Sequence, residues 1–204
     1  AHSTGMPVMR PMFMTFNKDA RTFAMDDQFM LGPALLVKPV HRAGETSASV
    51  YLPRTVVDPV LGGDYAVGSD GLSVPTLWYD FWKHGSVEVP PSPPGATAGS
   101  PGLDYTVQLS KDRVPVFQLG GTVVVTRERV RRSSAAMRGD PVTLLVCADA
   151  KGKAKGSVFV DDEDTFDYRD KGAMAFGDII LTEAGLRYAA GVRPEAVFSP
   201  VDVV

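Results

Sequence analysis

The sequence has a single cysteine, no long apolar run and no basic excess, and each absence excludes a class of protein. With Cys147 alone, the chain cannot form an internal disulfide, and the apolar residues around this thiol favour a buried, unreactive side chain over a reactive one. No apolar run approaches the roughly 18 residues of a membrane-spanning helix. The formal net charge of −3 argues against nucleic-acid or membrane-surface partners, which select for clustered basic residues.

Helix-forming segments are also scarce, and the start of the chain is atypical. The sequence contains 20 glycines and 16 prolines, a composition that suits short strands and many turns better than helices. Ala1 is not an initiator methionine, and neither a basic nor an apolar signal-peptide region follows it. We therefore expect the chain to begin inside a longer protein.

What is present from residue 34 onward is a series of short strand patterns separated by turn residues. The expected strands are 34–40, 48–52, 77–82, 86–89, 103–109, 114–119, 122–126, 142–148, 156–160 and 179–181. Gly120-Gly121 between two apolar runs predicts a hairpin, and Lys151-Gly152-Lys153 predicts a turn. Short strands with turns at this spacing are typical of a β-sandwich.

The two ends of the chain have different patterns. Residues 6–16 are apolar with a break at Pro11, which predicts a strand of a covered parallel sheet. Residues 22–32 predict a short helix that ends at Gly32, and residues 182–190 predict a second, weaker helix that Thr182 caps. Glycine- and proline-rich loops at 54–76 and 90–102 are expected to be surface insertions.

Two groups of acidic residues are candidates for chemistry. Acid–base hydrolysis with paired carboxyls needs two that face each other, and a cation site needs clustered oxygen ligands. Asp26 and Asp27 lie next to the expected helix, where acidic residues usually have a structural role. Asp161, Asp162, Glu163 and Asp164 follow a strand and favour a turn, with a cation site as the alternative.

Other polar and aromatic groups have comparable alternatives. His2, His41 and His84 lack metal-ligand spacing, so we expect surface or hydrogen-bonded histidines. The run from Arg127 to Arg138 is either an anion site or a set of arginines that pair with carboxylates and carbonyls between two β-units. The aromatic group Trp78, Tyr79, Phe81 and Trp82 either stacks on sugar rings or packs in a sandwich core. No nucleophile elbow or phosphate-binding glycine loop is present.

An ordered set of motifs between Arg10 and Tyr168 resembles the family 31 glycoside hydrolases. Any one of these motifs would be weak evidence, but the whole set in order is specific. They are Pro7-Val8-Met9-Arg10-Pro11, Thr22-Phe23, Asp26-Asp27-Gln28-Phe29-Met30-Leu31-Gly32, Ala34-Leu35-Leu36-Val37, Val50-Tyr51-Leu52-Pro53, Trp78-Tyr79-Asp80-Phe81-Trp82, Val114-Pro115-Val116-Phe117-Gln118, Gly120-Gly121-Thr122, Val130-Arg131-Arg132-Ser133-Ser134, Met137, Asp140-Pro141, Asp161-Asp162 and Thr165-Phe166-Asp167-Tyr168. The arginine run, the Asp-Pro pair and Lys83-His84-Gly85 are most similar to the glucosidase II branch of the family.

The resemblance implies a mainly β architecture at the C-terminal side of a catalytic barrel. Residues 1–32 would be the last strand and helix of a (β/α)8 barrel, residues 33–126 a proximal C-terminal β-sandwich, and residues 127–204 part of a distal β-domain. Glu163 departs from the family pattern, which has glycine after the two aspartates. The loops at 54–76 and 90–102 are longer than the family pattern, and the match fades after Tyr168.

The resemblance also implies a function, namely that of a retaining α-glucosidase with an aspartate nucleophile and an aspartate acid/base. The motif that carries these aspartates is absent, so no catalytic, metal-binding or cofactor-binding residue is assigned, and no cofactor is expected. In the glucosidase II branch, the enzyme trims glucose from N-glycans in the endoplasmic reticulum lumen and works with a β-subunit. The implied partners are thus the rest of the parent α-subunit, that β-subunit and the oligosaccharide substrate.

Two functions remain open at this point. The first is an inactive scaffold portion of a parent α-glucosidase. The second is a non-catalytic β-sandwich module for carbohydrate or protein binding, or a structural component of a larger assembly. The length of the native chain separates them, because the first requires a parent much longer than 204 residues.

Overall fold

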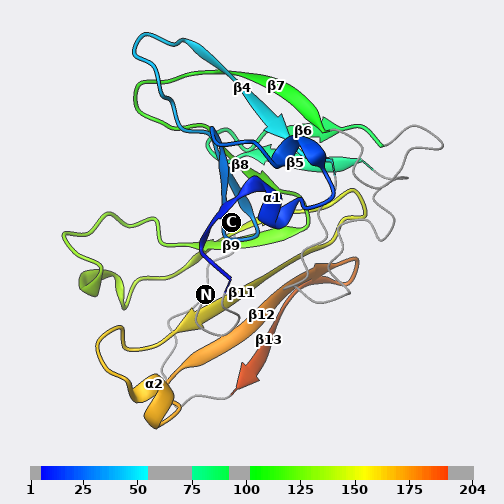
Figure 1. The fold of residues 1–204 in the computed structure, drawn as a ribbon. Helices are drawn as coiled ribbons and strands as arrows, with labels where there is room; N and C mark the ends of the chain where they lie inside the picture. The colour runs from blue at the N-terminus through cyan, green and yellow to red at the C-terminus, as the bar shows by residue number, and fades with distance from the viewer. Residues whose placement is uncertain (1–5, 55–74, 92–101, 193–204) are drawn as a thin grey trace. The chain divides into compact units, whose positions relative to one another are not determined.

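The structure, a computed structural model, describes residues 6–54, 75–91 and 102–192, and strands are their main regular elements. The chain divides into two units (Figure 1). The first comprises Ala1–Gly121 with Ala148–Lys151, and the second comprises Thr122–Cys147 with Gly152–Val204. The loops expected at 54–76 and 90–102 fall almost entirely outside the described residues.

The first unit contains two antiparallel sheets. The larger has the strand order β1-β2-β3-β8-β5-β6, and the smaller pairs β4 with β7 (Figure 1). The bounds are β1 Met9–Pro11, β2 Phe29–Leu31, β3 Leu35–Val37, β4 Ser47–Leu52, β5 Thr76–Asp80, β6 Ser86–Val89, β7 Leu103–Gln108 and β8 Val116–Leu119. The predicted strands of this region are therefore present, within a few residues at their ends.

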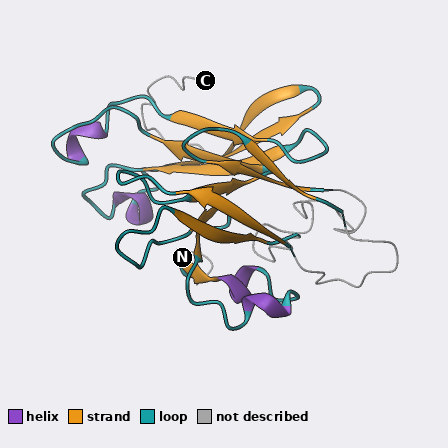
Figure 2. Ribbon diagram, turned by 90° about the horizontal axis from the view of Figure 1, so that it is seen from above, coloured by secondary structure: helices purple, strands orange, loops and turns teal. Residues whose placement is uncertain are grey.

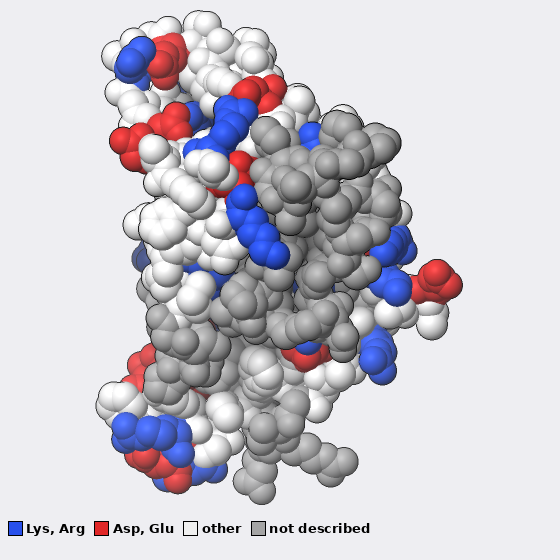
Figure 3. Space-filling view, turned by 45° about the vertical axis from the view of Figure 1, so that its right-hand side comes forward, with Lys and Arg blue, Asp and Glu red and all other residues white. Residues whose placement is uncertain are grey.

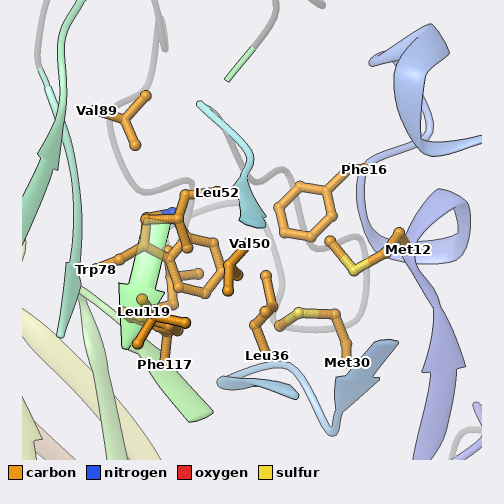
Figure 4. Close-up of a cluster of buried hydrophobic side chains, with 11 residues drawn as sticks. Met12, Phe16, Met30, Leu36, Val50, Leu52, Trp78, Val89, Phe117 and Leu119 are labelled. Atoms are coloured by element: carbon orange, nitrogen blue, oxygen red, sulfur yellow. The ribbon is translucent and has the colours of Figure 1, made fainter. Parts of the chain in front are cut away.

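Side chains from both sheets form one apolar core. The buried residues are Met12, Phe16, Met30, Leu36, Val50, Leu52, Trp78, Val89, Val107, Phe117 and Leu119. Figure 4 shows Phe16 and Met12 approaching from the N-terminal segment toward Leu36, Val50 and Trp78. Because strands of the large sheet and of the β4-β7 pair share this core, the first unit is a β-sandwich, as the sequence predicts.

The N-terminal segment differs from its prediction in two ways. Residues 6–16 form the short strand β1, which ends at Pro11, and the four-residue helix α1, Met12–Thr15. The break lies where proline removes the ladder donor. The strand β1 pairs antiparallel with β2, so the predicted parallel sheet is wrong for this segment, and the barrel end implied for residues 1–32 is not confirmed.

The helix predicted for residues 22–32 is also wrong. A short 3-10 helix, η1, covers only Ala20–Thr22, and Phe29–Leu31 forms a strand that pairs with β1 on one side and β3 on the other. The spacing of the apolar residues fits both structures. The two neighbouring strands decide the outcome, since they satisfy the backbone of β2 while Met30 is fully buried. Gly32, with φ +61°, lies in the β2-β3 turn.

The second unit is built on a five-stranded sheet with the order β10-β9-β11-β12-β13. The bounds are β9 Thr122–Thr126, β10 Thr143–Cys147, β11 Ala154–Val160, β12 Ala175–Thr182 and β13 Gly185–Val192, with short helices η2 Ala135–Met137 and α2 Asp167–Asp170. Figure 2 shows strands, in orange, as the main regular elements of the described chain, with only short helices. Only β11 and β9 pair in parallel, among the described strands.

The hairpin predicted at Gly120-Gly121 is wrong, although both strands are present. The strand β8 pairs with β3 and β5, whereas β9 pairs with β10 and β11, so the two glycines connect different sheets. The Gly120 amide donates to the Leu77 carbonyl at 2.7 Å. A Cβ at Gly120 would lie 2.9 Å from the carbonyl oxygens of Leu77 and Ala148, so a close backbone approach explains the glycine there.

The helix predicted for residues 182–190 is wrong as well. This segment contains the end of β12 and most of β13, which pair antiparallel from Thr182↔Gly185 onward. Gly185 has φ +110°, which suits a tight hairpin turn. The alanines favour a helix locally, but pairing with an eight-residue strand satisfies the backbone and overrides that weak preference.

We predict that replacing Phe117 with alanine lowers the free energy of unfolding by about 3–5 kcal/mol, because it leaves a cavity in the shared core. The matched control is Phe23→Ala, since Phe23 is 58% exposed in the same unit while Phe117 is fully buried. Urea unfolding followed by tryptophan fluorescence measures both variants, since Trp78 lies in this core. Equal losses in the two variants would contradict the assigned core.

Candidate functional site

The hydroxyl of Tyr51, on β4, is the centre of a buried polar network in the first unit. It donates to the Asp19 carboxylate and accepts from the Gly102 amide at 2.5 Å. Both Tyr51 and Asp19 are buried. Burial, and then the bond to Asp19, raises the pKa of Tyr51 well above its ordinary value. The phenol therefore stays protonated and holds its donor toward the carboxylate.

A second layer of contacts joins the same two parts of the chain. The guanidinium of Arg21 lies 4.1 Å from the Tyr51 ring centroid and forms two hydrogen bonds with Asp104, at 3.0 and 2.9 Å. The side chain of Gln28 donates to the Tyr51 carbonyl at 2.7 Å and accepts from the Tyr51 amide at 2.9 Å. Polar contacts to the hydroxyl, ring and backbone of Tyr51 on β4, and to Asp104 on β7, thus hold residues 19–28 against these two strands.

The adjacent residues Asp26 and Asp27 differ in their contacts. Asp27 pairs with Lys38, whose side chain is only 10% exposed. A nearly buried ammonium needs such a partner, so Asp27 fits the structural role that the sequence favours. Asp26 forms no hydrogen bond or ion pair with the rest of the described chain.

We predict that Tyr51→Phe destabilises the first unit by roughly 1–3 kcal/mol, since it removes one of the donors to the buried Asp19 carboxylate and the acceptor of the Gly102 amide. Tyr105→Phe is the matched control, because the structure assigns the Tyr105 hydroxyl no hydrogen bond among the described residues. Denaturant midpoints at neutral pH compare the two variants. If Tyr105→Phe costs as much as Tyr51→Phe, the network does not stabilise the fold.

The aromatic group at residues 78–82, on β5 and in the turn after it, divides between the core and the surface. Trp78 is fully buried, and its indole donates to the Pro53 carbonyl at 3.0 Å. The Tyr79 hydroxyl donates to the Ala148 carbonyl at 2.9 Å. Trp82 differs, because it is 40% exposed. Only Trp82, among the tryptophans, is therefore open to a ligand.

Arginines of the run pair with carboxylates, as one of its two interpretations predicts, but these pairs lie within the second unit and not between two β-units. Arg131 forms two hydrogen bonds with Asp140, at 2.8 and 2.6 Å, and Arg129 lies 3.5 Å from the same carboxylate. The bonds from Arg131 hold the pKa of the buried Asp140 carboxyl below its ordinary value. Arg127 and Arg138 pair with Glu163 and Asp164 respectively. Figure 3 shows basic side chains, in blue, next to acidic side chains, in red, on the visible surface.

The acidic segment 161–164 forms a turn. The Asp161 carboxylate accepts from the Glu163 amide, and the Asp162 carboxylate accepts from the amides of Asp164 and Thr165 and from the Thr165 hydroxyl. Glu163 has φ +58°, the left-handed conformation that glycine adopts easily. This geometry suits the glycine that the resemblance implies at this position.

Arg131→Gln is predicted to lower stability at neutral pH and to flatten its acid dependence. Because the folded pKa of Asp140 is depressed, its contribution is present above the unfolded value of about 3.9 and is lost as pH falls through the folded pKa. Arg132→Gln is the control, since Arg132 makes no hydrogen bond or ion pair in the described part of the chain. Urea midpoints measured between about pH 5 and 2 give both effects. Identical curves for the two variants would contradict the pair.

In the part of the chain that the structure describes, the remaining candidates form no arrangement suited to metal binding. His41 and His84 are exposed, and His2 lies outside the described residues. Burial raises the pKa of the Cys147 thiol to about 11, which fits the unreactive side chain expected from the sequence. Among the described residues, no cluster of histidine, cysteine and acidic side chains could hold a metal ion. The described helices are also too short or too polar to cross a membrane.

Among the cavities of the described surface, two are lined by candidate residues from the sequence. One, of about 340 Å³, lies in the first unit against Trp82 and the turns that flank it. The other, of about 390 Å³, lies in the second unit beside Arg127, Phe159 and Glu163. Each cavity has an exposed aromatic ring, Trp82 or Phe159, next to polar side chains. In the second cavity, Arg127 and Glu163 pair with each other, whereas in the first the side chains of Lys83, Gln108 and Asp112 have no partner in the described part of the chain.

The chain is similar to known glycosidases over most of its length. The "Glycosyl hydrolase family 31 C-terminal domain" model matches residues 5–58. Neutral alpha-glucosidase AB of Mus musculus is 39% identical over 171 residues, which are 84% of this chain and 15% of that protein. A probable glucan 1,3-alpha-glucosidase of Arabidopsis thaliana is 32% identical over 98% of this chain and 18% of its own length.

A solved structure gives the same result for the fold. The crystal structure of the endoplasmic reticulum glucosidase II complex, which contains the catalytic subunit and the binding domain of the regulatory subunit, matches with a TM-score of 0.71. That match has 29% identity and covers 92% of this chain and 17% of that one. The chain thus spans less than a fifth of the length of these relatives. The family resemblance found in the sequence is confirmed: the chain matches the C-terminal domain of glycoside hydrolase family 31 α-glucosidases such as glucosidase II.

Proposed function

We propose that this chain is the C-terminal scaffold portion of a retaining α-glucosidase that resembles glucosidase II and trims glucose from N-glycans. The observation that carries the proposal is the match to the C-terminal domain of relatives several times longer. The motif with the catalytic aspartates is absent from the sequence. Catalysis would therefore belong to other parts of the parent chain, and the sandwich would support the wall of the active site.

The exposed apolar side chains of the N-terminal segment support this role. Four apolar side chains that lie close together in sequence are between 44% and 60% exposed, namely those of Val8, Met9, Phe13 and Phe23. A group of exposed apolar side chains commonly marks an interface. We propose that these residues contact the catalytic barrel of the parent chain. The end of that barrel, which the resemblance implies for residues 1–32, would then join the sandwich through β1 and β2, which pair in the large sheet.

The same proposal divides the rest of the chain and places it in the cell. Residues 33–126 would form the proximal C-terminal β-sandwich, and residues 127–204 part of the distal β-domain. The partners would be the rest of the parent α-subunit and a regulatory β-subunit, as in the solved heterodimer. The location would be the endoplasmic reticulum lumen, by analogy with that complex.

The purified chain of residues 1–204 is predicted to show no turnover of p-nitrophenyl α-glucoside, because a substrate bond cannot be attacked without the two catalytic carboxyls. Trp78 fluorescence and a cooperative urea transition must first show that the chain is folded. Hydrolysis by this folded chain, at a rate above a mock purification, would contradict the scaffold assignment.

A further inference from the structure

A preformed pocket in the first unit combines an exposed indole ring with unpaired polar side chains. It is lined by Asp80, Trp82, Lys83, Gln108, Asp112, Arg113 and nearby apolar residues. Its volume, about 340 Å³, is at the small end of the range of ligand pockets, about 300–1,000 Å³. We propose that this pocket binds a short neutral oligosaccharide, with Trp82 as the apolar wall for a sugar ring.

The backbone around Trp82 is held in place before any ligand arrives. One carboxylate oxygen of Asp80 accepts from the amides of Trp82 and Lys83, both at 2.9 Å, which fixes the turn after β5. The Trp82 indole donates to the Val114 carbonyl at 2.8 Å, and Phe81 packs edge-on against it at 5.0 Å between centroids. A fixed ring loses little conformational entropy when a ligand contacts it.

The opposite wall comes from the turn between β7 and β8. Ser110 and Arg113 form an isolated β-bridge, which closes this turn. The guanidinium carbon of Arg113 lies 5.2 Å from the Trp82 ring centroid, so this side chain connects the β7-β8 turn with the turn that carries Trp82. The pocket is thus formed by two tight turns rather than by a long loop.

The polar lining selects a neutral, hydroxyl-rich ligand. Within the described part of the chain, the side chains of Lys83, Gln108 and Asp112 form no hydrogen bond or ion pair. Two carboxylates and two cations face the same space, so an anion would meet Asp80 and Asp112 as well as the cations. A sugar hydroxyl both donates and accepts, so it can satisfy the carboxylates, the amide and the ammonium together. A purely apolar ligand would leave these groups unpaired.

The test is titration of the ¹⁵N-labelled chain with maltotriose, followed through the two indole N–H resonances. The Trp82 resonance should shift, while that of Trp78, buried in the core, should stay in place. Trp82→Ala and Asp112→Asn should each weaken binding by about tenfold, the factor that roughly 1.4 kcal/mol of lost interaction gives. Phe166→Ala, which removes an exposed ring in the second unit, should leave the affinity unchanged.

Three results would overturn the proposal. They are an unmoved Trp82 resonance, equal affinities in Trp82→Ala and Phe166→Ala, and displacement of maltotriose by inorganic phosphate, which would indicate an anion site. Asp112 lies in an exposed turn, and asparagine keeps the shape of its side chain. The Asp112→Asn variant therefore still measures the contribution of the pocket to binding if Trp82→Ala does not fold. Binding is measured without hydrolysis, so this result and the activity of the chain are independent.

Discussion

The first unit depends on one buried contact, the hydrogen bond from the Tyr51 hydroxyl to the Asp19 carboxylate. A carboxylate out of water is costly unless donors surround it, so Asp19 can lie here only because Tyr51 and the Arg21 amide supply hydrogen bonds. The same hydrogen bond between Asp19 and Tyr51 holds residues 19–22 against β4. The apolar contacts of Phe16 and Met12 with the core then follow from that position.

The strands were largely predictable, because alternation and turn residues are local signals. Residues 86–89 and 122–126 form strands with the predicted bounds. The wrong predictions share a cause: the strand that pairs with each segment, and so decides its structure, is not recognisable from the neighbouring sequence. Nothing near residues 29–31 reveals that two strands flank them, and the alanines of 185–192 favour a helix until β12 pairs with them. At Gly120-Gly121 both strands were correct, but their pairing partners were not.

The polar contacts show the same limit. The run of arginines beside acidic residues predicted arginine–carboxylate pairs, and Arg131–Asp140 is such a pair within nine residues. In contrast, Tyr51 is 32 residues from Asp19, and Arg21 is 83 residues from Asp104, so no local pattern connects them. Tyr51 entered the sequence argument only as part of a family motif. The motif marks a position that the structure explains through its hydroxyl, its ring and its backbone together.

A double-mutant cycle between Asp19 and Tyr51 tests most directly whether this contact holds the N-terminal segment on the sandwich. The cycle compares the unfolding free energies of Asp19→Asn, Tyr51→Phe and the double variant with that of the parent chain. Direct contact predicts non-additivity of about 0.5–3 kcal/mol, with the double variant less destabilised than the sum of the single variants. Strict additivity of the two substitutions would show that the contact contributes nothing, and the account of the first unit would be wrong.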